Sequence, residues 1–485
     1  MSTRPYNIVL LMSDQWRWDT ILQADHPCQT PNMQRLAREG VIFDNAFSCV
    51  PLCCPARGSL FTGLWPHQTG LMDNVQQGSF YPHGKLHSKH KTYLERLRDD
   101  AGYAVRYAGK WHMGQGTAAE RGIEADVSDG AAPDRRGTNA VKPTITGDAL
   151  PPFYASFPEG KGRDQCAIEA GMAHIESMAQ GDRPFCAVIS TWGPHFPHTI
   201  PRRYADLYAD STPVGFMPDN YCPPFVEENK PRTQSKPYWP CQNTRPLTSE
   251  DWRKTVAHYW AFCTYLDEQF GRLLDRLDEL CIAENTVIAF AVDHGEMLGA
   301  HGNFDKGPYF YEEIMHIPVI VRDPQHRSPR NTESLVNLRD LFPTLISLAG
   351  AEHVLDNDER ARSYWHTDND KTFYTYDDYQ GRQFKLRGIR THRWKYHWSP
   401  HDLCELYDLE TDPGERTNLV DDPSCAQIKA DLHHRLVSWM EAEGDYLLHA
   451  QHLMPVGSYV DGRSFEEQHD PGWPDRDKAW FAQEE

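Results

Sequence analysis

The sequence lacks any long hydrophobic run. No uninterrupted apolar stretch in the 485 residues approaches the length of about 18 that a membrane-spanning helix requires. The N-terminal stretch MSTRPYNIVLLMSDQ reaches Asp14 too early to contain the apolar core and cleavage site of a secretory signal. We therefore expect no membrane partner and a cytoplasmic location.

The chain also lacks an excess of basic residues. It contains 49 Lys and Arg against 69 Asp and Glu, for a formal net charge of −20 at pH 7. Proteins that bind nucleic acid normally present a basic face, so this composition argues against a nucleic-acid partner. An acidic surface still permits a small basic pocket for an anion. The oligomeric state cannot be read from the sequence.

The 12 cysteines do not show the spacing of a structural zinc site. Cys49, Cys53 and Cys54 form one crowded cluster, and no second C-x-x-C pair accompanies it. A disulfide between the adjacent pair would be strained. Cysteines of a cytoplasmic chain are expected to be thiols, and a buried thiol most often fills space in the core.

Two short apolar runs are present, and each ends in an aspartate. They are YNIVLLMSD, which ends at Asp14, and NTVIAFAVD, which ends at Asp293. Apolar runs without alternation are typical of strands buried on both faces, and therefore of a parallel sheet. Parallel sheets bind ligands at the carboxyl ends of their strands. Helical patterns, such as the one after Thr248, alternate with the strand patterns and predict an α/β fold with a large, mostly parallel sheet between helices.

The pattern changes from about residue 370. TFYTYDDY, FKLRGIRT, WKYHW and CELYDLETD are typical of short antiparallel strands, and a helix that ends near Gly444 follows them. We predict a catalytic domain over residues 1–365 and a smaller C-terminal α+β subdomain over residues 366–485. Residues 114–165 and 211–247, rich in Gly or Pro, are predicted to be long loops, and the aromatics of the second to line a pocket.

The stretch SCVPLCCPARGSLFTG, residues 48–63, points to a more specific role for Cys53. Pro55 suits the first position of a helix over PARGSLFT that Gly63 would close. Cys53 then lies just before a helix N-terminus, with Arg57 one turn into the helix. This placement favours negative charge and would activate a thiolate or an oxyanion, so the local pattern indicates a nucleophile.

CCPARGSLFTG resembles the C-x-P-x-R core motif of the type I sulfatases, which belong to the alkaline phosphatase superfamily. Cys53 aligns with the cysteine that this family oxidises to formylglycine, an aldehyde whose hydrate is the nucleophile, while Ala56 fits the fourth motif position. The resemblance implies an alkaline phosphatase-like fold and hydrolysis of sulfate monoesters. It also implies a partner that matures Cys53, either a formylglycine-generating enzyme or an anaerobic sulfatase-maturing enzyme.

The resemblance further implies one divalent metal ion. Asp14-Gln15 and Asp293-His294 match the metal ligands of the family, and the hydroxyl derived from Cys53 would complete the set. Many relatives carry a second aspartate where this chain has Gln15. Carboxylates at two strand ends suit a hard cation, and calcium is usual in the family, with magnesium or manganese as alternatives.

Four further polar residues match positions that surround the sulfate ester in the family. YAGKWHMG supplies Lys110 and His112, and their spacing after an extended run predicts that both point to the same side. His195, in GPHFPH, matches the histidine that faces the leaving-group oxygen, and Lys306 matches a second sulfate-binding lysine. Asn74, in GLMDN, is a further candidate for the pocket lining.

Hydrolysis of a sulfate ester builds charge on the peripheral oxygens and on the leaving alkoxide, so the site needs a cation, oxyanion donors and an acid. By the resemblance, the hydrate formed from Cys53 attacks sulfur while His195 protonates the leaving alcohol. His112 then takes the remaining hydroxyl proton. Lys110, Lys306 and the metal stabilise the developing charge.

Two other functions fit part of these features. Phosphonate monoester and phosphodiester hydrolases share the C-x-P-x-R motif and resemble DQWR at residues 14–17, but they tend to carry Tyr and Thr in place of Lys110 and His112. The K-x-H pair therefore favours a sulfatase. A non-catalytic binding protein on this scaffold would have an unmodified Cys53 and a disabled metal site. The expected substrate is a small or carbohydrate sulfate, such as a sulfated sugar or choline sulfate.

Overall fold

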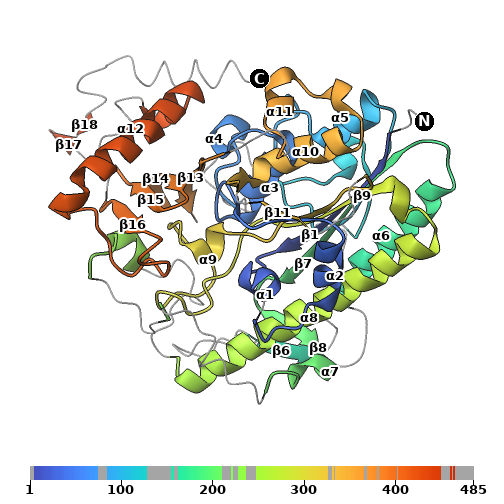
Figure 1. Ribbon diagram of the computed structural model, residues 1–485, viewed down its shortest axis with the longest axis horizontal. Coiled ribbons are helices and arrows are strands. Elements are labelled where there is room, and N and C mark those ends of the chain that lie inside the picture. Colours follow the sequence, from blue (N-terminus) through green and yellow to red (C-terminus); the bar gives the residue numbers. More distant parts are fainter. Residues whose placement is uncertain are drawn as a thin grey trace.

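The protein is described by a computed structural model that covers residues 5–23, 25–74, 85–127, 154–157, 162–209, 220–221, 228–235, 247–325, 330–332, 334–364, 369–379, 382–400, 402–448, 459–460 and 463–464. Its centre is an eight-stranded sheet in the order β11-β2-β10-β9-β1-β7-β4-β5 (Figure 1). In that order the strands are Arg330–Thr332, Val41–Phe43, Ile320–Arg322, Thr286–Val292, Asn7–Asp14, Phe185–Pro194, Ala104–Gly109 and Glu124–Asp126. Only β10 among these strands runs antiparallel to its neighbours, which confirms the predicted mixed, mostly parallel sheet.

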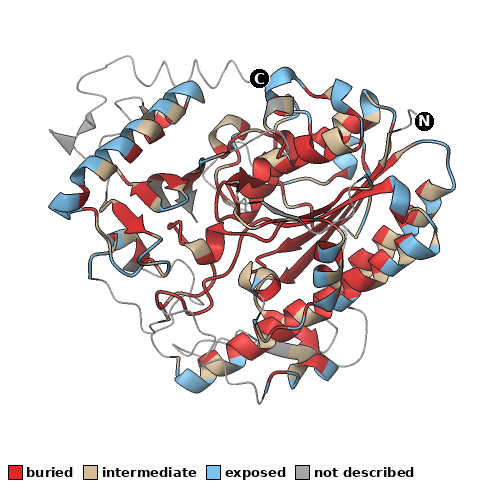
Figure 2. Ribbon diagram, in the orientation of Figure 1, coloured by how far each residue is buried: buried red, intermediate tan, exposed pale blue. Residues whose placement is uncertain are grey.

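The two predicted aspartate-terminated strands, β1 and β9, lie side by side in the middle of this sheet. Their register runs from Asn7 opposite Thr286 to Ser13 opposite Val292. Every residue of both strands is buried, because helices cover both faces of the sheet (Figure 2). Parallel strands in register end at the same edge, so the aspartates that follow are brought together there.

Two layers of helices cover the sheet (Figure 1). One layer contains α2 (Pro31–Arg38), α6 (Arg163–Ala179) and α8 (Ser249–Glu279), and the other contains α3 (Cys53–Thr62), α5 (Tyr93–Asp99) and α10 (Leu341–Leu348). Shorter helices are α1 (Asp19–Leu22), α4 (Pro66–Thr69), α7 (Arg202–Ala205), α9 (Glu312–Met315) and α11 (Asn357–Ala361). The helix predicted after Thr248 is confirmed as α8: the Thr248 hydroxyl accepts a hydrogen bond from the backbone N–H of Asp251, whose carboxylate accepts one from the Thr248 N–H.

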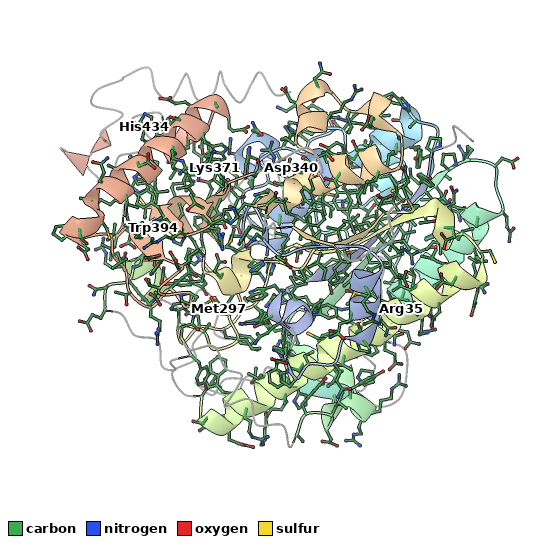
Figure 3. All side chains as sticks on the ribbon, viewed as in Figure 1. Arg35, Met297, Asp340, Lys371, Trp394 and His434 are labelled. Atoms are coloured by element: carbon green, nitrogen blue, oxygen red, sulfur yellow. The ribbon has the colours of Figure 1, made fainter. Side chains whose placement is uncertain are left out.

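The predicted C-terminal antiparallel sheet is confirmed. It has the order β13-β14-β15-β16, with strands Lys371–Tyr379, Arg382–Thr391, Trp394–Trp398 and Glu405–Asp408. Helix α12 (Ala426–Ala442) packs on it through Leu432 and Leu436. Figure 3 labels Lys371 and Trp394 on the strands and His434 on this helix. The proposed domain boundary at residues 365–366 falls outside the described residues and stays a prediction.

Three two-stranded pairings complete the described part of the chain. Strand β3 (Ala46–Phe47) pairs with β12 (Val336–Asn337), and β6 (Tyr154–Phe157) pairs with β8 (His198–Pro201). Strand β17 (Tyr459–Val460) pairs with β18 (Arg463–Ser464). Within residues 114–165, predicted as a loop, β5 adds an edge strand to the main sheet and β6 pairs with β8. Most of residues 211–247 lies outside the described part of the chain, as do most of the aromatics predicted to line a pocket. Tyr221 is described, and it packs edge-on against Trp252 of α8.

The cysteines that the structure describes are thiols, in agreement with the sequence, and Cys49 and Cys53 are both buried. Across the same described residues, no helix combines the length and the apolar character needed to cross a bilayer. The cellular location remains a prediction.

Asp267 of α8 provides a test of the helix packing. Its carboxylate accepts hydrogen bonds from the backbone N–H groups of Asn32 and Met33, at 3.0 and 2.8 Å, where α2 begins. Burial raises its pKa from 3.8 to about 6, although these hydrogen bonds oppose the shift. A carboxyl whose pKa is raised by folding contributes stability at low pH, and that contribution is lost as the pH rises through its folded pKa.

We therefore predict that the wild type loses about 3 kcal/mol of unfolding free energy relative to Asp267→Asn between about pH 4 and pH 7. The variant has no carboxyl at this position to ionise. Chemical unfolding of both proteins across this pH range measures the difference. A difference that does not vary with pH would contradict the assignment.

Candidate active site

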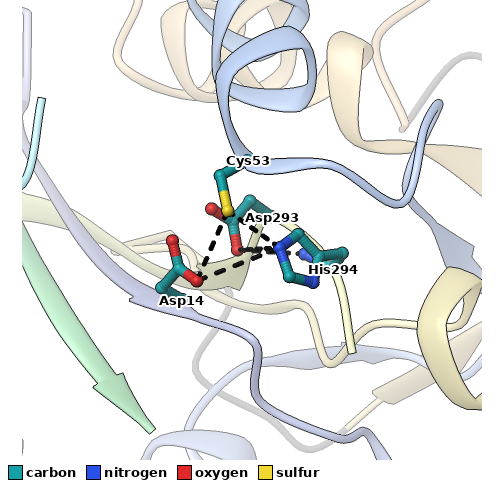
Figure 4. A group of neighbouring side chains, drawn as sticks. All are labelled: Asp14, Cys53, Asp293 and His294. Atoms are coloured by element: carbon teal, nitrogen blue, oxygen red, sulfur yellow. Dashed lines mark hydrogen bonds and ion pairs between the residues drawn. The ribbon is translucent and has the colours of Figure 1, made fainter. Parts of the chain in front are cut away.

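Four of the predicted ligands meet at the carboxyl edge of the sheet, beyond the ends of β1 and β9 (Figure 4). They are Asp14, Cys53, Asp293 and His294, all of them buried, and their ligand atoms lie within 4.8 Å of one another. Cys53 Sγ is 3.1 Å from His294 Nε2 and 3.7 Å from Asp14 Oδ1. Three segments far apart in the sequence thus form one candidate metal site.

Helix α3 begins at Cys53, so the prediction that it starts at Pro55 is wrong by two residues. Proline is tolerated in the first turn because an N–H there has no intrahelical partner. The predicted stop at Gly63 is confirmed: this residue has φ +72°, and a Cβ there would lie 2.1 Å from the Tyr93 hydroxyl. The helix start places the Cys53 side chain directly at the strand ends.

The unmodified Cys53 side chain is a poor nucleophile in this environment. Burial, and then the charge of Asp14, raise the pKa of its thiol to about 12. The unmodified thiol therefore does not meet the expectation of an activated thiolate, because burial, and then the nearby Asp14 carboxylate, outweigh the effect of the helix N-terminus. Asn74 lies beside the thiol as predicted: its Oδ1 accepts a hydrogen bond from the Cys54 N–H at 2.9 Å, and its Nδ2 is 3.9 Å from Cys53 Sγ.

Arg57 joins the two aspartates. Its Nε donates to Asp293 Oδ2 at 2.8 Å and its Nη2 to Asp14 Oδ2 at 3.3 Å. Its Nη1 donates to the Lys110 carbonyl and to Ser190 Oγ, both at 2.9 Å. The guanidinium and both carboxylates are fully buried. Charges at such a position are tolerated only when they are paired and hydrogen-bonded, and Arg57 meets that requirement for both acids.

Lys110 adds a second cation at Asp14, since its Nζ contacts Asp14 Oδ2. Burial by itself would raise the pKa of Asp14, but Lys110, followed by His195 and Arg57, holds it well below the usual range. Burial likewise opposes the charge of Lys110, yet Asp14 leaves the lysine pKa raised. Both groups are therefore charged.

His112 follows Lys110 beyond the end of β4. It has φ +48°, in the left-handed region that side chains rarely adopt, so the two residues do not alternate along a strand and that reasoning is wrong. His112 nevertheless interacts electrostatically with the site. Burial of its ring, then Lys110 and Arg57, lower its pKa well below the usual value, and the neutral imidazole can accept a proton.

His195 follows β7 and contacts Lys306. The distance from Lys306 Nζ to His195 Nε2 is 2.9 Å, and Lys306 Nζ also lies 3.0 Å from Asp305 Oδ1. An ammonium only donates, so Nε2 accepts and the Nδ1–H donates to the Phe196 carbonyl at 2.6 Å. Burial and then Lys306 lower the pKa of His195 well below its usual value, which agrees with a neutral ring.

Gln15 also reaches the site, and it does so with φ +67° immediately after β1. Its Oε1 accepts a hydrogen bond from Lys306 Nζ at 3.0 Å, and its Nε2 donates to Glu296. The sequence reasoning did not identify Glu296, a fully buried acid in DHGEML. Burial, and then Asp305, raise its pKa to about 7. Its position three residues after Asp293 was the available signal, but a lone acid after a strand is more often a turn residue.

The donor set fits a divalent cation. Asp14 and Asp293 supply carboxylate oxygens, which hard cations prefer. The Nδ1–H of His294 donates to the Gly295 carbonyl at 2.9 Å, which leaves Nε2 with a lone pair toward the cluster, and burial lowers the pKa of this histidine. Cys53 Sγ stands where an oxygen of formylglycine would lie after maturation.

The ion pairs of the site join the carboxylates of Asp14, Asp293 and Asp305 to the cations of Arg57, Lys110 and Lys306. Glu296, whose pKa is raised to about 7 by burial and then by Asp305, adds a further acid in contact with Gln15. A divalent cation held by Asp14 and Asp293 would add positive charge close to Lys110, which would favour an anionic ligand.

Comparison with known proteins identifies the family. The chain matches the Sulfatase family model over residues 6–351, and the model of the N-sulphoglucosamine sulphohydrolase C-terminal region over residues 299–442. The protein therefore belongs to the sulfatase family of sulfuric ester hydrolases, in the alkaline phosphatase superfamily. Members of this family typically need a metal ion and formylglycine.

Two relatives and one solved structure illustrate this similarity. An ulvan-active sulfatase of Formosa agariphila is 27% identical, with 95% of this chain and 86% of the relative covered. A choline-sulfatase of Rhizobium meliloti is 29% identical, with 87% and 84% covered. The structure of a phosphonate monoester hydrolase from Silicibacter pomeroyi has a TM-score of 0.75 at 20% identity, with 92% and 97% covered, and shows a shared fold.

The Arg57 pairing leads to a prediction about stability. Arg57→Met leaves two buried carboxylates without their common partner, and we expect a loss of about 3–5 kcal/mol of unfolding free energy in the presence of a chelator. Calcium should restore more stability to this variant than to the wild type, because it neutralises the same carboxylates.

Thermal unfolding with chelator and with calcium measures both effects. The matched control is Arg203→Met, since Arg203 forms an exposed pair with Glu268 and exposed pairs contribute little. If Arg57→Met and Arg203→Met respond alike to calcium, the proposed role of Arg57 is wrong.

Proposed function

We propose that this sulfatase hydrolyses the sulfate monoester of a small or carbohydrate alcohol. The reaction would use formylglycine at position 53 and one divalent cation, for which calcium is the first candidate. The convergence of Asp14, Cys53, Asp293 and His294 within 4.8 Å carries this proposal. One relative is named an ulvan-active sulfatase and the other a choline-sulfatase, and these names support a substrate of this class. A formylglycine-generating or anaerobic maturing enzyme would convert Cys53.

Asp14, Asp293 and His294 would hold the cation, together with Gln15 Oε1 and an oxygen of the residue at position 53. A bound cation supplies positive charge for the sulfate oxygens, and formylglycine supplies a hydrated aldehyde as an oxygen nucleophile. Arg57 remains outside this set and keeps both carboxylates ionised and in place. The side chain of Asn74, whose Nδ2 is 3.9 Å from Cys53 Sγ, would line the substrate pocket beside position 53.

Lys110 and Lys306 would bind the peripheral oxygens of the sulfate group. Both lysines are buried, and both interact electrostatically with position 53. Charge that develops on these oxygens in the transition state meets donors already fixed by Asp14 and Asp305, so little reorganisation is needed. Such donors each contribute on the order of a few kcal/mol to transition-state stabilisation.

His195 would protonate the leaving alcohol. Its Nε2 lies 2.9 Å from the ammonium of Lys306, which is a proton source, and a bound sulfate anion favours the charged form of the imidazole. His112, neutral in this structure, would take the remaining hydroxyl proton at position 53. The two histidines thus have opposite roles, one as acid and the other as base.

Hydrolysis of a phosphonate monoester or a phosphodiester is the second candidate, because a phosphonate monoester hydrolase shares the fold with a TM-score of 0.75. The presence of both Lys110 and His112 favours a sulfate ester. Competition between nitrophenyl sulfate and a phenylphosphonate ester on the same preparation separates the two activities. We expect the sulfate ester to be hydrolysed with the higher kcat/KM.

Replacement of the nucleophile tests the proposal. In protein co-produced with a maturing enzyme, mass spectrometry should find formylglycine at position 53, and Cys53→Ala should lower kcat/KM by about 10³-fold or more. Cys49→Ala is the matched control, since Cys49 is a buried cysteine four residues away and should leave kcat within about twofold. Full turnover by Cys53→Ala would exclude the proposed nucleophile.

The role of His195 depends on the leaving group. His195→Ala should slow esters of alkyl alcohols by about 10²- to 10⁴-fold, because an alkoxide needs a proton as it leaves. The activity of this variant toward nitrophenyl sulfate should fall far less, since nitrophenolate is a stable anion and leaves without a proton. Steady-state kinetics on the two substrates measure the contrast. Equal losses on both would show that His195 does not act as the acid.

A further inference from the structure

Both carboxylate oxygens of Glu296 accept hydrogen bonds close to the site, although Glu296 does not belong to the four-residue cluster. Its side chain is fully buried in the segment that follows β9. Oε1 accepts hydrogen bonds from the backbone N–H groups of Leu298, at 3.0 Å, and Asp305. Oε2 accepts one from Gln15 Nε2. The two backbone donors fix the carboxylate, so its second oxygen has a fixed position opposite Gln15.

The orientation of the Gln15 amide follows from the chemistry of its two partners. A carboxylate only accepts hydrogen bonds, and the Lys306 ammonium only donates them. The amide nitrogen must therefore face Glu296, and Oε1 must face Lys306, from which it accepts a hydrogen bond at 3.0 Å. The backbone N–H of Gln15 donates to Asp293 Oδ1 at 3.2 Å, which ties the same residue to the cluster.

We propose that Glu296 is a positioning residue that fixes the Gln15 amide, so that its oxygen and not its nitrogen is directed to Lys306 and the cation. The inference rests on the cation site of the proposed function. An amide oxygen can ligate a cation, whereas an amide nitrogen has no lone pair to offer. Through Gln15 and Lys306, the same contacts reach His195.

An isosteric change separates this role from simple packing. In Glu296→Gln, the two backbone N–H groups of Leu298 and Asp305 require the new amide to place its oxygen toward them. Its nitrogen then faces the nitrogen of Gln15, and two donors oppose each other. Either the two amide nitrogens stay opposed and push Gln15 out of place, or Gln15 turns its amide over, which places a second donor against Lys306 and removes the oxygen from the cation. Side-chain volume is unchanged throughout.

The reciprocal exchange should repair the defect. In the double variant Gln15→Glu/Glu296→Gln, the amide at position 296 donates to the carboxylate at position 15, and that carboxylate accepts from Lys306. We expect Glu296→Gln to weaken calcium binding by about 10- to 100-fold, the range typical for groups that orient a ligand. The double variant should recover most of this loss and should bind calcium better than either single variant.

Isothermal titration of calcium into the chelator-treated full-length proteins measures these affinities without reference to turnover. The kcat and KM for nitrophenyl sulfate and the thermal midpoint in chelator are recorded on the same preparations. Asp267→Asn is the matched control, because it removes a buried carboxylate from α8 away from the site and should keep the wild-type calcium affinity.

Wild-type calcium affinity in Glu296→Gln overturns the inference, and so does a double variant that binds no better than Glu296→Gln. If Glu296→Gln does not fold, the double variant must fold, and its failure to do so also overturns the inference. A wild-type protein that binds no calcium overturns the proposed cation site, and the inference with it. If the wild type binds calcium and Glu296→Gln binds it equally well, the inference about Glu296 is overturned while the proposed cation site stands.

Discussion

The site depends on one buried interaction, in which Arg57 pairs with Asp14 and Asp293. Both carboxylates are completely buried, where they would repel each other and lose hydration. The parallel register of β1 and β9 brings the acids to one edge of the sheet, and α3 supplies the guanidinium that holds them there. The same helix starts at Cys53, so the pairing that stabilises the acids also places the Cys53 side chain beside them.

This arrangement explains how the protein keeps so many charges in its interior. Each cation at the site contacts a carboxylate: Arg57 and Lys110 contact Asp14, and Lys306 contacts Asp305. Burial and then neighbouring cations lower the pKa values of His112 and His195, which favours their neutral forms. A divalent cation and an anionic substrate would therefore enter a site in which each of these cations already contacts a carboxylate, and each would compensate for the other.

Patterns within single segments predicted much of this structure. The apolar runs before Asp14 and Asp293 predicted buried strands of a parallel sheet, and the changed pattern after residue 370 predicted a second, antiparallel sheet. The motif around Cys53 predicted the family, and the structure places Cys53 in the candidate metal site. These features are local, because strand burial and the cysteine motif are each encoded in a few consecutive residues.

What the sequence did not reveal depends on contacts between distant segments or on backbone detail. Glu296 acquires its role from Gln15, 281 residues away, and no local pattern records such a contact. His112 reaches the site through a left-handed backbone conformation, which spacing along a strand does not predict. Burial, and then Asp14, raise the thiol pKa of Cys53, so its position at a helix N-terminus did not predict the ionisation of the thiol correctly.

The most direct test is a crystal structure of catalytically active, matured protein grown with calcium, with anomalous diffraction recorded to locate the ion. We predict one calcium ion bound by Asp14, Asp293 and His294, in contact with an oxygen of formylglycine at position 53. An active protein with an unmodified Cys53, or with no ion between these residues, would contradict the account.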